Sequence, residues 1–143
     1  MKKLKLNINI KTYNKNIPSN IEIYNWIKKT INKKNAEITV KIVDTNEIRL
    51  INKKYRNLNK PTNILSFKYI KKYSDIYILG DIIICPKIIE TEASILNLKL
   101  KNYWCKIIIH GILHLLGYNH KNNIDTNIME KLEEKIIKIL IKG

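Results

Sequence analysis

Cysteine is scarce in this sequence, where residues 85 and 105 are the only two among 143. Two cysteines are too few for a disulfide framework in a chain long enough to build a hydrophobic core. The thiols are therefore expected to be free and buried. The spacing of Cys85 gives no reason to place it near a metal site.

Long apolar runs are also missing. No run approaches the ~18 apolar residues that a membrane-spanning helix needs. The first residues, MKKLKLNINIK, alternate between polar and apolar side chains and lack the apolar segment of a signal peptide. We expect a soluble, cytoplasmic protein without a membrane partner.

Acidic residues are few, with 12 Asp and Glu against 27 Lys and Arg, which gives a net charge of +15. Such a charge is typical of proteins that bind nucleic acid. The excess of lysine, asparagine and isoleucine is also what an AT-rich genome would produce. The charge therefore permits RNA binding without proving it, although any basic protein gains sequence-independent affinity for phosphates.

The length and the hydrophobic fraction of 45% suit one domain, residues 1–143, with one sizeable core. Apolar periodicity and turn residues predict an α+β order of strand, helix, strand, helix, two strands and three helices. The predicted strands are 4–10, 37–44, 64–67 and 77–85. The predicted helices are 20–34, 45–56, 86–96, 103–116 and one from Asp125 or Thr126 to Ile141.

Side-chain patterns refine this prediction. Residues 68–74 are basic and polar and are expected to form an exposed hairpin loop, and Asn102 is a candidate cap for the helix that follows it. By periodicity alone, Met129 belongs in the core and Glu133 faces solvent. The inward positions expected for helices 45–56 and 125–141 are Ile48, Ile51 and Tyr55, and Ile128, Leu132, Ile136 and Ile139.

All three histidines fall within IIIHGILHLLGYNH, residues 107–120. His110 and His114, four residues apart, share one face of a helix, and Gly117 can end the helix so that His120 returns to the same point. Three converging neutral imidazoles with an open fourth position form a catalytic Zn²⁺ site. The alternative is hydrogen-bonded core histidines, but three in eleven residues and none elsewhere favour a metal.

The position after the first histidine argues against peptidase chemistry. Metzincin peptidases carry a glutamate there as general base, and this chain has Gly111. A zinc ion still lowers the pKa of its bound water to about 7, so hydrolysis without that glutamate remains available.

The stretch HGILHLLGYNH resembles the H-G-x-L-H-L-x-G-Y-D-H signature of the YbeY family of bacterial rRNA-maturation endoribonucleases. Other blocks agree in order: residues 52–67 (NKKYRNLNKPTNILSF), residues 79–85 (LGDIIIC), and Met129 with Glu133. The resemblance implies one mixed β-sheet of about four strands packed with helices, and a central, zincin-like helix that carries the metal-ligand histidines His110, His114 and His120.

The resemblance also implies a function. By this resemblance, the protein is expected to be a Zn²⁺-dependent endoribonuclease specific for single-stranded RNA, acting in 16S rRNA 3′-end maturation and ribosome quality control. The implied partners are the 16S rRNA precursor and the small ribosomal subunit with its proteins, and the Era GTPase is a candidate. Metal identity stays open, because imidazole also suits nickel, copper and iron.

A phosphodiester transition state calls for a cation aimed at the phosphate oxygens, and arginine does this bidentately. Arg56, one of two arginines in the chain, is the candidate catalytic and substrate-binding residue; sequence alone fits a surface arginine at a helix end equally well. The resemblance favours the catalytic role. Lys60 and Asn63, with Thr62 and Ser66, either contact substrate or hold the turn around Pro61.

Two further positions are open. Asp81 either supports a histidine through its second ring nitrogen or faces solvent. Asn119 stands where the family usually has aspartate, so we expect a retained metal and modest activity.

One alternative to the nuclease is a ribosome-associated assembly factor with a structural or vestigial metal site, which the open coordination position disfavours. A hydrolase of peptides or small molecules is the other, and Gly111 makes peptides the weaker case.

Overall fold

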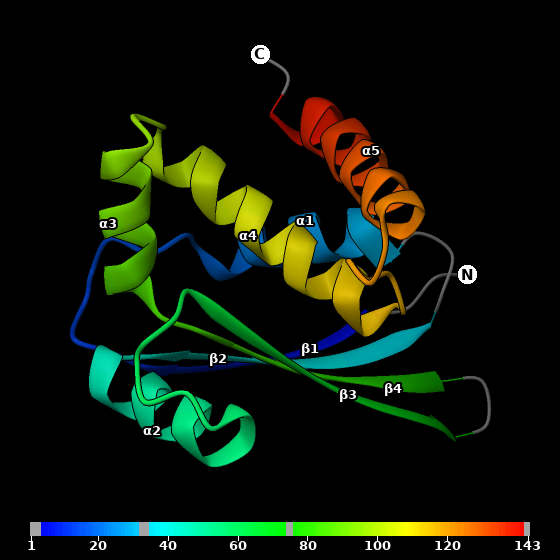
Figure 1. Ribbon diagram of the computed structural model, residues 1–143. Coiled ribbons are helices and arrows are strands. Elements are labelled where there is room, and N and C mark those ends of the chain that lie inside the picture. Colours follow the sequence, from blue (N-terminus) through cyan, green and yellow to red (C-terminus); the bar gives the residue numbers. More distant parts are fainter. Residues whose placement is uncertain (1–3, 32–34, 74–75, 142–143) are drawn as a thin grey trace.

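The computed structural model describes residues 4–31, 35–73 and 76–141 (Figure 1). The observed order confirms the predicted α+β class. The strands are β1 (Leu4–Lys11), β2 (Ala36–Val43), β3 (Ile64–Tyr73) and β4 (Ile76–Ile84). The helices are α1 (Asn20–Ile31), α2 (Thr45–Arg56), α3 (Pro86–Ile95), α4 (Leu100–Leu115) and α5 (Asn123–Leu140).

The four strands form one mixed sheet in the order β1-β2-β4-β3. β1 and β2 are parallel, as are β2 and β4, whereas β3 runs antiparallel to β4. β3 is therefore an edge strand. This confirms the mixed four-stranded sheet.

Helices cover the two faces of the sheet unequally (Figure 1). On one face, α1, α4 and α5 enclose the larger core together with β-strand residues such as Val40 and Ile82. On the other face, α2 covers a smaller cluster that includes Ile48, Ile83 and Cys85. Ile82 and Ile83 enter different clusters because neighbouring strand residues point to opposite faces.

Helix α4 lies across the larger face and is buried on nearly every side, including Trp104, Ile108 and Ile112. It contacts α1, α3, α5, β3 and β4. Gly111 allows a close approach to β3, because a Cβ there would lie 2.5 Å from Cδ1 of Ile64. The fit places the histidine end of α4 directly over the edge strand.

Several predicted boundaries were wrong. Residues 68–73 continue β3 instead of forming a loop, because Lys71 and Lys72 pair with β4. Strand pairing uses backbone hydrogen bonds, so basic and polar side chains do not prevent it. Ser74 lies outside the described residues. Helix α4 begins after Lys99, so Asn102 lies inside it and caps nothing. Helix α5 begins at Asn123 because the Asn122 side chain accepts a hydrogen bond from the Asp125 N–H.

Three side chains expected to face inward are largely exposed. Tyr55 is 61% exposed and meets Phe67 edge-on, with ring centroids 5.2 Å apart. Ile128 and Ile139 are 51% and 49% exposed, because α5 turns Met129 and Ile136 toward the core instead. In helix 20–34, residues 32–34 lie outside the described part of the chain. Among the described residues, no helix combines the length and apolar character that crossing a membrane would require.

Candidate metal centre and active-site cleft

The chain reverses direction immediately after α4. Gly117 adopts φ 106°, a left-handed conformation that favours glycine. The N–H of Gly117 donates to the His114 carbonyl at 3.0 Å, and the N–H of Tyr118 donates to the Leu113 carbonyl at 3.1 Å. These two bonds form a Schellman motif. The turn returns His120 to the face of α4 that carries the other two histidines, as the spacing predicted.

The three imidazoles converge. One potential ligand nitrogen of each of His110, His114 and His120 lies within 4.8 Å of the others. The Nε2 atoms of His110 and His114 are 3.2 Å apart. Two imidazole nitrogens bound to tetrahedral zinc at about 2.0–2.1 Å lie roughly 3.3 Å from each other. The cluster therefore fits a metal ion, and its three nitrogens leave a position for water.

Cys85 does not supply a fourth ligand. It is buried beside Ile48 in the cluster under α2. Burial raises the pKa of the Cys85 thiol, and burial raises that of Cys105 to about 12, so both thiols stay protonated at neutral pH. The expectation of two free, buried cysteines is confirmed.

His114 is kept neutral by its surroundings. Burial lowers its pKa most, and the positive charges that His110 and His120 can carry lower it further. A hydrogen bond with the backbone of Tyr118 opposes this shift, and the nearby Arg56 guanidinium adds to it. A neutral imidazole keeps the nitrogen lone pair that a metal needs.

Glu133, expected to face solvent, is instead buried, and its Oε2 lies 3.0 Å from Nδ1 of His110. The position of this carboxylate was missed because the predicted apolar stripe included Ile128 and Ile139, which are exposed, although Met129 and Ile136 were correctly placed inward. A signal was present, since residues 129, 133 and 136 follow a spacing of four and three and therefore share one face of a helix. Met129 and Ile136 are both buried.

A cleft of about 580 Å³ opens beside His110 and His114. Arg56, the last residue of α2, lines it, and its guanidinium is close enough to affect His114. Two lysines that the sequence motifs did not indicate, Lys68 and Lys106, also line the cleft. Periodicity could have found both: residue 106 lies one turn before His110, and residue 68 shares a strand face with Ile64 and Ser66.

Of the other candidate substrate-binding residues, three line the cleft and Lys60 does not. Asn63 lines the cleft, and its Nδ2 donates to Oε1 of Glu92 at 2.9 Å. The same oxygen accepts the Tyr103 hydroxyl, and burial followed by this carboxylate raises the pKa of Tyr103 to about 12. Thr62 and Ser66 line the cleft too, whereas Lys60 is absent from its lining and uses its carbonyl to accept a hydrogen bond from Asn52.

Asp81 does not support a histidine. Its Oδ2 accepts the Tyr69 hydroxyl at 2.7 Å, beside a smaller hollow lined by Ile51 and Ile83 on the α2 face of the sheet. Asn119 helps to shape the turn, because its Oδ1 accepts the N–H of Lys121 at 3.0 Å.

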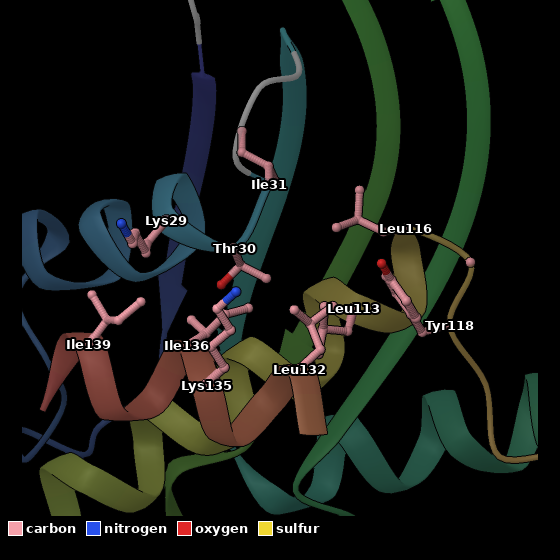
Figure 2. Close-up of a pocket in the computed structure, with 11 residues that line it drawn as sticks. Lys29, Thr30, Ile31, Leu113, Leu116, Tyr118, Leu132, Lys135, Ile136 and Ile139 are labelled. Atoms are coloured by element: carbon pink, nitrogen blue, oxygen red, sulfur yellow. The ribbon is translucent and has the colours of Figure 1, made fainter. Parts of the chain in front are cut away.

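A second hollow of about 570 Å³ lies between α1, α5 and the end of α4 (Figure 2). Its lining is mainly apolar, with Leu113, Leu132 and Ile136 along the helices and Lys29 and Lys135 as its charged groups. None of the three histidines lines it. The histidine cluster therefore borders the first cleft and not this hollow.

The fold and the site together define an α+β protein whose central helix carries a three-histidine cluster that could hold a metal ion. An open histidine site of this kind is the arrangement used by metal-dependent hydrolases. The comparison with known proteins narrows this class.

The sequence model of the family described as Endoribonuclease YbeY matches residues 5–141. The chain is 50% identical over 127 residues to Endoribonuclease YbeY of Buchnera aphidicola from Acyrthosiphon pisum, covering 87% of this chain and 82% of the relative. It is 40% identical over 148 residues to Endoribonuclease YbeY of Francisella tularensis strain SCHU S4, covering 95% and 88%. The chain therefore belongs to the YbeY endoribonuclease family.

A solved relative has the same overall arrangement. The solution structure of a Thermotoga maritima protein superposes with a TM-score of 0.62 at 26% identity, covering 93% of this chain and 88% of that one. The resemblance seen in the histidine block thus extends over nearly the whole chain.

Proposed function

We propose that this protein is a metal-dependent endoribonuclease, specific for single-stranded RNA, that acts in 16S rRNA 3′-end maturation and ribosome quality control. The observation that carries the proposal is the meeting of two different chemistries in one cleft. His110 and His114 of the histidine cluster form one wall, and the Arg56 guanidinium lies close enough to influence His114. Membership of the family supports RNA as the substrate.

Each wall has its own task in this proposal. His110, His114 and His120 would hold the ion, and Zn²⁺, when bound, supplies a Lewis acid that makes water nucleophilic near neutral pH. Arg56 binds the non-bridging oxygens of the scissile phosphate and offsets the charge that grows on them in the transition state. It thereby acts as both a substrate-binding and a catalytic residue.

The neighbours of Arg56 bind the rest of the RNA strand. Lys68 and Lys106 line the same cleft and can pair with phosphates on either side of the scissile one. Asn63 offers hydrogen bonds from the cleft wall, and the exposed Lys60 side chain extends the basic surface beyond it. An unpaired strand is the substrate that can bend to bring one phosphate to both walls.

The cellular setting is proposed from the family. The chain would act as a single domain in the cytoplasm, on the small ribosomal subunit and its proteins, with the Era GTPase as a candidate partner. If the protein bound ribosomal subunits without cutting RNA, the assembly-factor alternative would take its place.

The test compares one RNA sequence in single-stranded and duplex form, with wild-type protein and His114→Ala purified in parallel. The expected result is cleavage of the single strand by the wild type only, and the matched variant controls for a contaminating nuclease. Equal cleavage by both proteins, or cleavage by neither, would contradict the proposal.

A further inference from the structure

Helix α5 directs one carboxylate inward to the metal centre. Glu133 is 7% exposed, and it is the one charged residue among the buried side chains in the described part of the chain. Its neighbours on the same helix, Glu130 and Glu134, are exposed. A carboxylate is costly to bury unless a partner compensates the lost hydration.

The partner is a nitrogen of a metal-ligand candidate. Oε2 of Glu133 lies 3.0 Å from Nδ1 of His110, which is a hydrogen-bond distance. An ionised carboxylate only accepts hydrogen bonds, so Nδ1 must carry the proton. In the neutral ring the lone pair then belongs to Nε2, the atom that lies 3.2 Å from Nε2 of His114. The contact therefore selects the nitrogen that faces the centre of the cluster.

We propose that Glu133 is a positioning residue that fixes His110 as the Nδ1–H tautomer and aims its Nε2 at the metal position. The inference rests on the proposed function only in taking the cluster to be a metal site. The Glu133 carboxylate also makes the His110 imidazole a more basic ligand. It brings one negative charge toward a set of otherwise neutral ligands. Glu133 supports the cluster through a side chain, so a substitution can remove this support.

The test measures Zn²⁺ binding to metal-free protein by competition with a chelating dye, without RNA. We expect Glu133→Ala to weaken Zn²⁺ binding about 10–100-fold. Glu133→Gln should lose less, because its amide oxygen can still accept the Nδ1–H hydrogen bond. The matched control Glu134→Gln removes an exposed charge one residue away, and it should bind as the wild type does.

Two further readouts separate positioning from structural support. The ¹⁵N chemical shifts of His110 in metal-free wild type should report the Nδ1–H tautomer. The rise in Tm on adding Zn²⁺ should shrink in Glu133→Ala and Glu133→Gln, whereas a structural role alone would lower the Tm equally with and without metal. If Glu133→Ala does not fold, the Zn²⁺ affinity of Glu133→Gln and the His110 tautomer of the wild type still test the proposal.

A bare Nδ1 in wild-type His110, or wild-type Zn²⁺ affinity in the Glu133 variants, would overturn the proposal. No RNA enters the measurement, so the two proposals can fail separately. A protein whose Zn²⁺ affinity depends on Glu133 but that cuts no RNA would support this inference and contradict the nuclease proposal. A protein that cuts RNA with unchanged metal affinity in Glu133→Gln and Glu133→Ala would do the reverse.

Discussion

The cleft has two walls that are held very differently. The histidine wall is formed by His110 and His114, and His120 completes the cluster beside it. The buried α4, the Schellman turn and Glu133 hold these side chains in place. The arginine wall consists of Arg56 and Asn63, and Arg56 is the exposed last residue of α2. The Arg56 guanidinium makes no hydrogen bond or ion pair with any residue that the structure describes.

This difference matches the demands of the two ligands. A metal ion requires three nitrogens placed within a few tenths of an ångström, so its ligands benefit from being fixed in advance. A phosphate on a flexible strand can adjust to its partner, so a free guanidinium keeps its hydrogen-bonding capacity for substrate. Each wall can therefore be disturbed separately, and the two should respond differently.

Removing the metal should have the largest effect. A chelator is expected to abolish RNA cleavage, and added Zn²⁺ to restore it, because in the proposed reaction the bound ion lowers the pKa of the attacking water to about 7. The measurement follows cleavage before chelation, after it and after readdition of the ion. Full activity in the presence of chelator, with no metal left in the protein, would contradict a metal-dependent reaction.

Changing the arginine wall should come next. Arg56→Ala is expected to lower kcat about 10²–10³-fold through loss of transition-state charge stabilisation. Arg56→Lys should recover part of this, because lysine keeps the charge and loses the bidentate geometry. Single-turnover cleavage rates measure both. An Arg56→Ala protein that cuts at the wild-type rate would show that the guanidinium has no such role.

Disturbing the support of the histidine wall should cost stability. Gly111→Ala would place a Cβ 2.5 Å from Cδ1 of Ile64 and 3.2 Å from Oγ of Ser66. We expect a loss of about 1–3 kcal/mol in the free energy of unfolding, typical of overpacking. Adding Ile64→Val removes the clashing Cδ1 and should restore part of it. Denaturant unfolding measures the wild type and both variants, and no rescue by Ile64→Val would mean that the clash is relieved elsewhere.

Acid should weaken the metal-free histidine wall. Burial, followed by the charges of the other two histidines, lowers the pKa of His114. The unfolded chain takes up this proton near pH 6.5, whereas the folded chain takes it up only at lower pH. The contribution of neutral His114 to the free energy of unfolding is therefore fully present above about pH 6.5. It is lost as the pH drops through the lowered pKa.

Thermal unfolding in chelator at pH 7.5 and 5.5 measures this dependence. The wild type should lose more Tm between the two conditions than His114→Asn does, since the variant has no proton to take up at this position. Equal losses would mean that folding does not lower the pKa of His114.

The smallest change is expected from Asn119→Asp. Aspartate can accept the same N–H of Lys121, so the turn should persist, and one partly exposed charge alters metal affinity or rate by at most about fivefold. Zn²⁺ affinity and cleavage rate measure the effect. Unchanged values would remove the reason to expect modest activity from asparagine, and a gain of more than about tenfold would mean that residue 119 helps to orient a ligand.

The local signals of the sequence were sufficient for the histidine wall. The spacing of the three histidines and Gly117 defined both the shared helix face and the turn, and the structure places them together. Helix α2 was predicted with its observed bounds, Thr45–Arg56, and with Ile48 correctly placed in the core. Features that depend on neighbours along the chain were thus predictable.

Features that depend on distant segments were not. The inward position of Glu133 arises from how α5 packs against α4, and the pairing of residues 68–73 depends on β4. Lys68 and Lys106 enter the cleft because β3 and α4 meet at Gly111. The spacing of residues 68, 106 and 133 indicates which strand or helix face each of them shares with its neighbours, but tertiary packing decides what that face meets.

The most direct test measures bound metal and single-stranded RNA cleavage in wild type, His114→Ala and Arg56→Ala purified in parallel. The division between the walls predicts that His114→Ala loses both metal and cleavage, whereas Arg56→Ala keeps the metal and loses cleavage. Cleavage at the wild-type rate by His114→Ala, or loss of metal from Arg56→Ala, would contradict it.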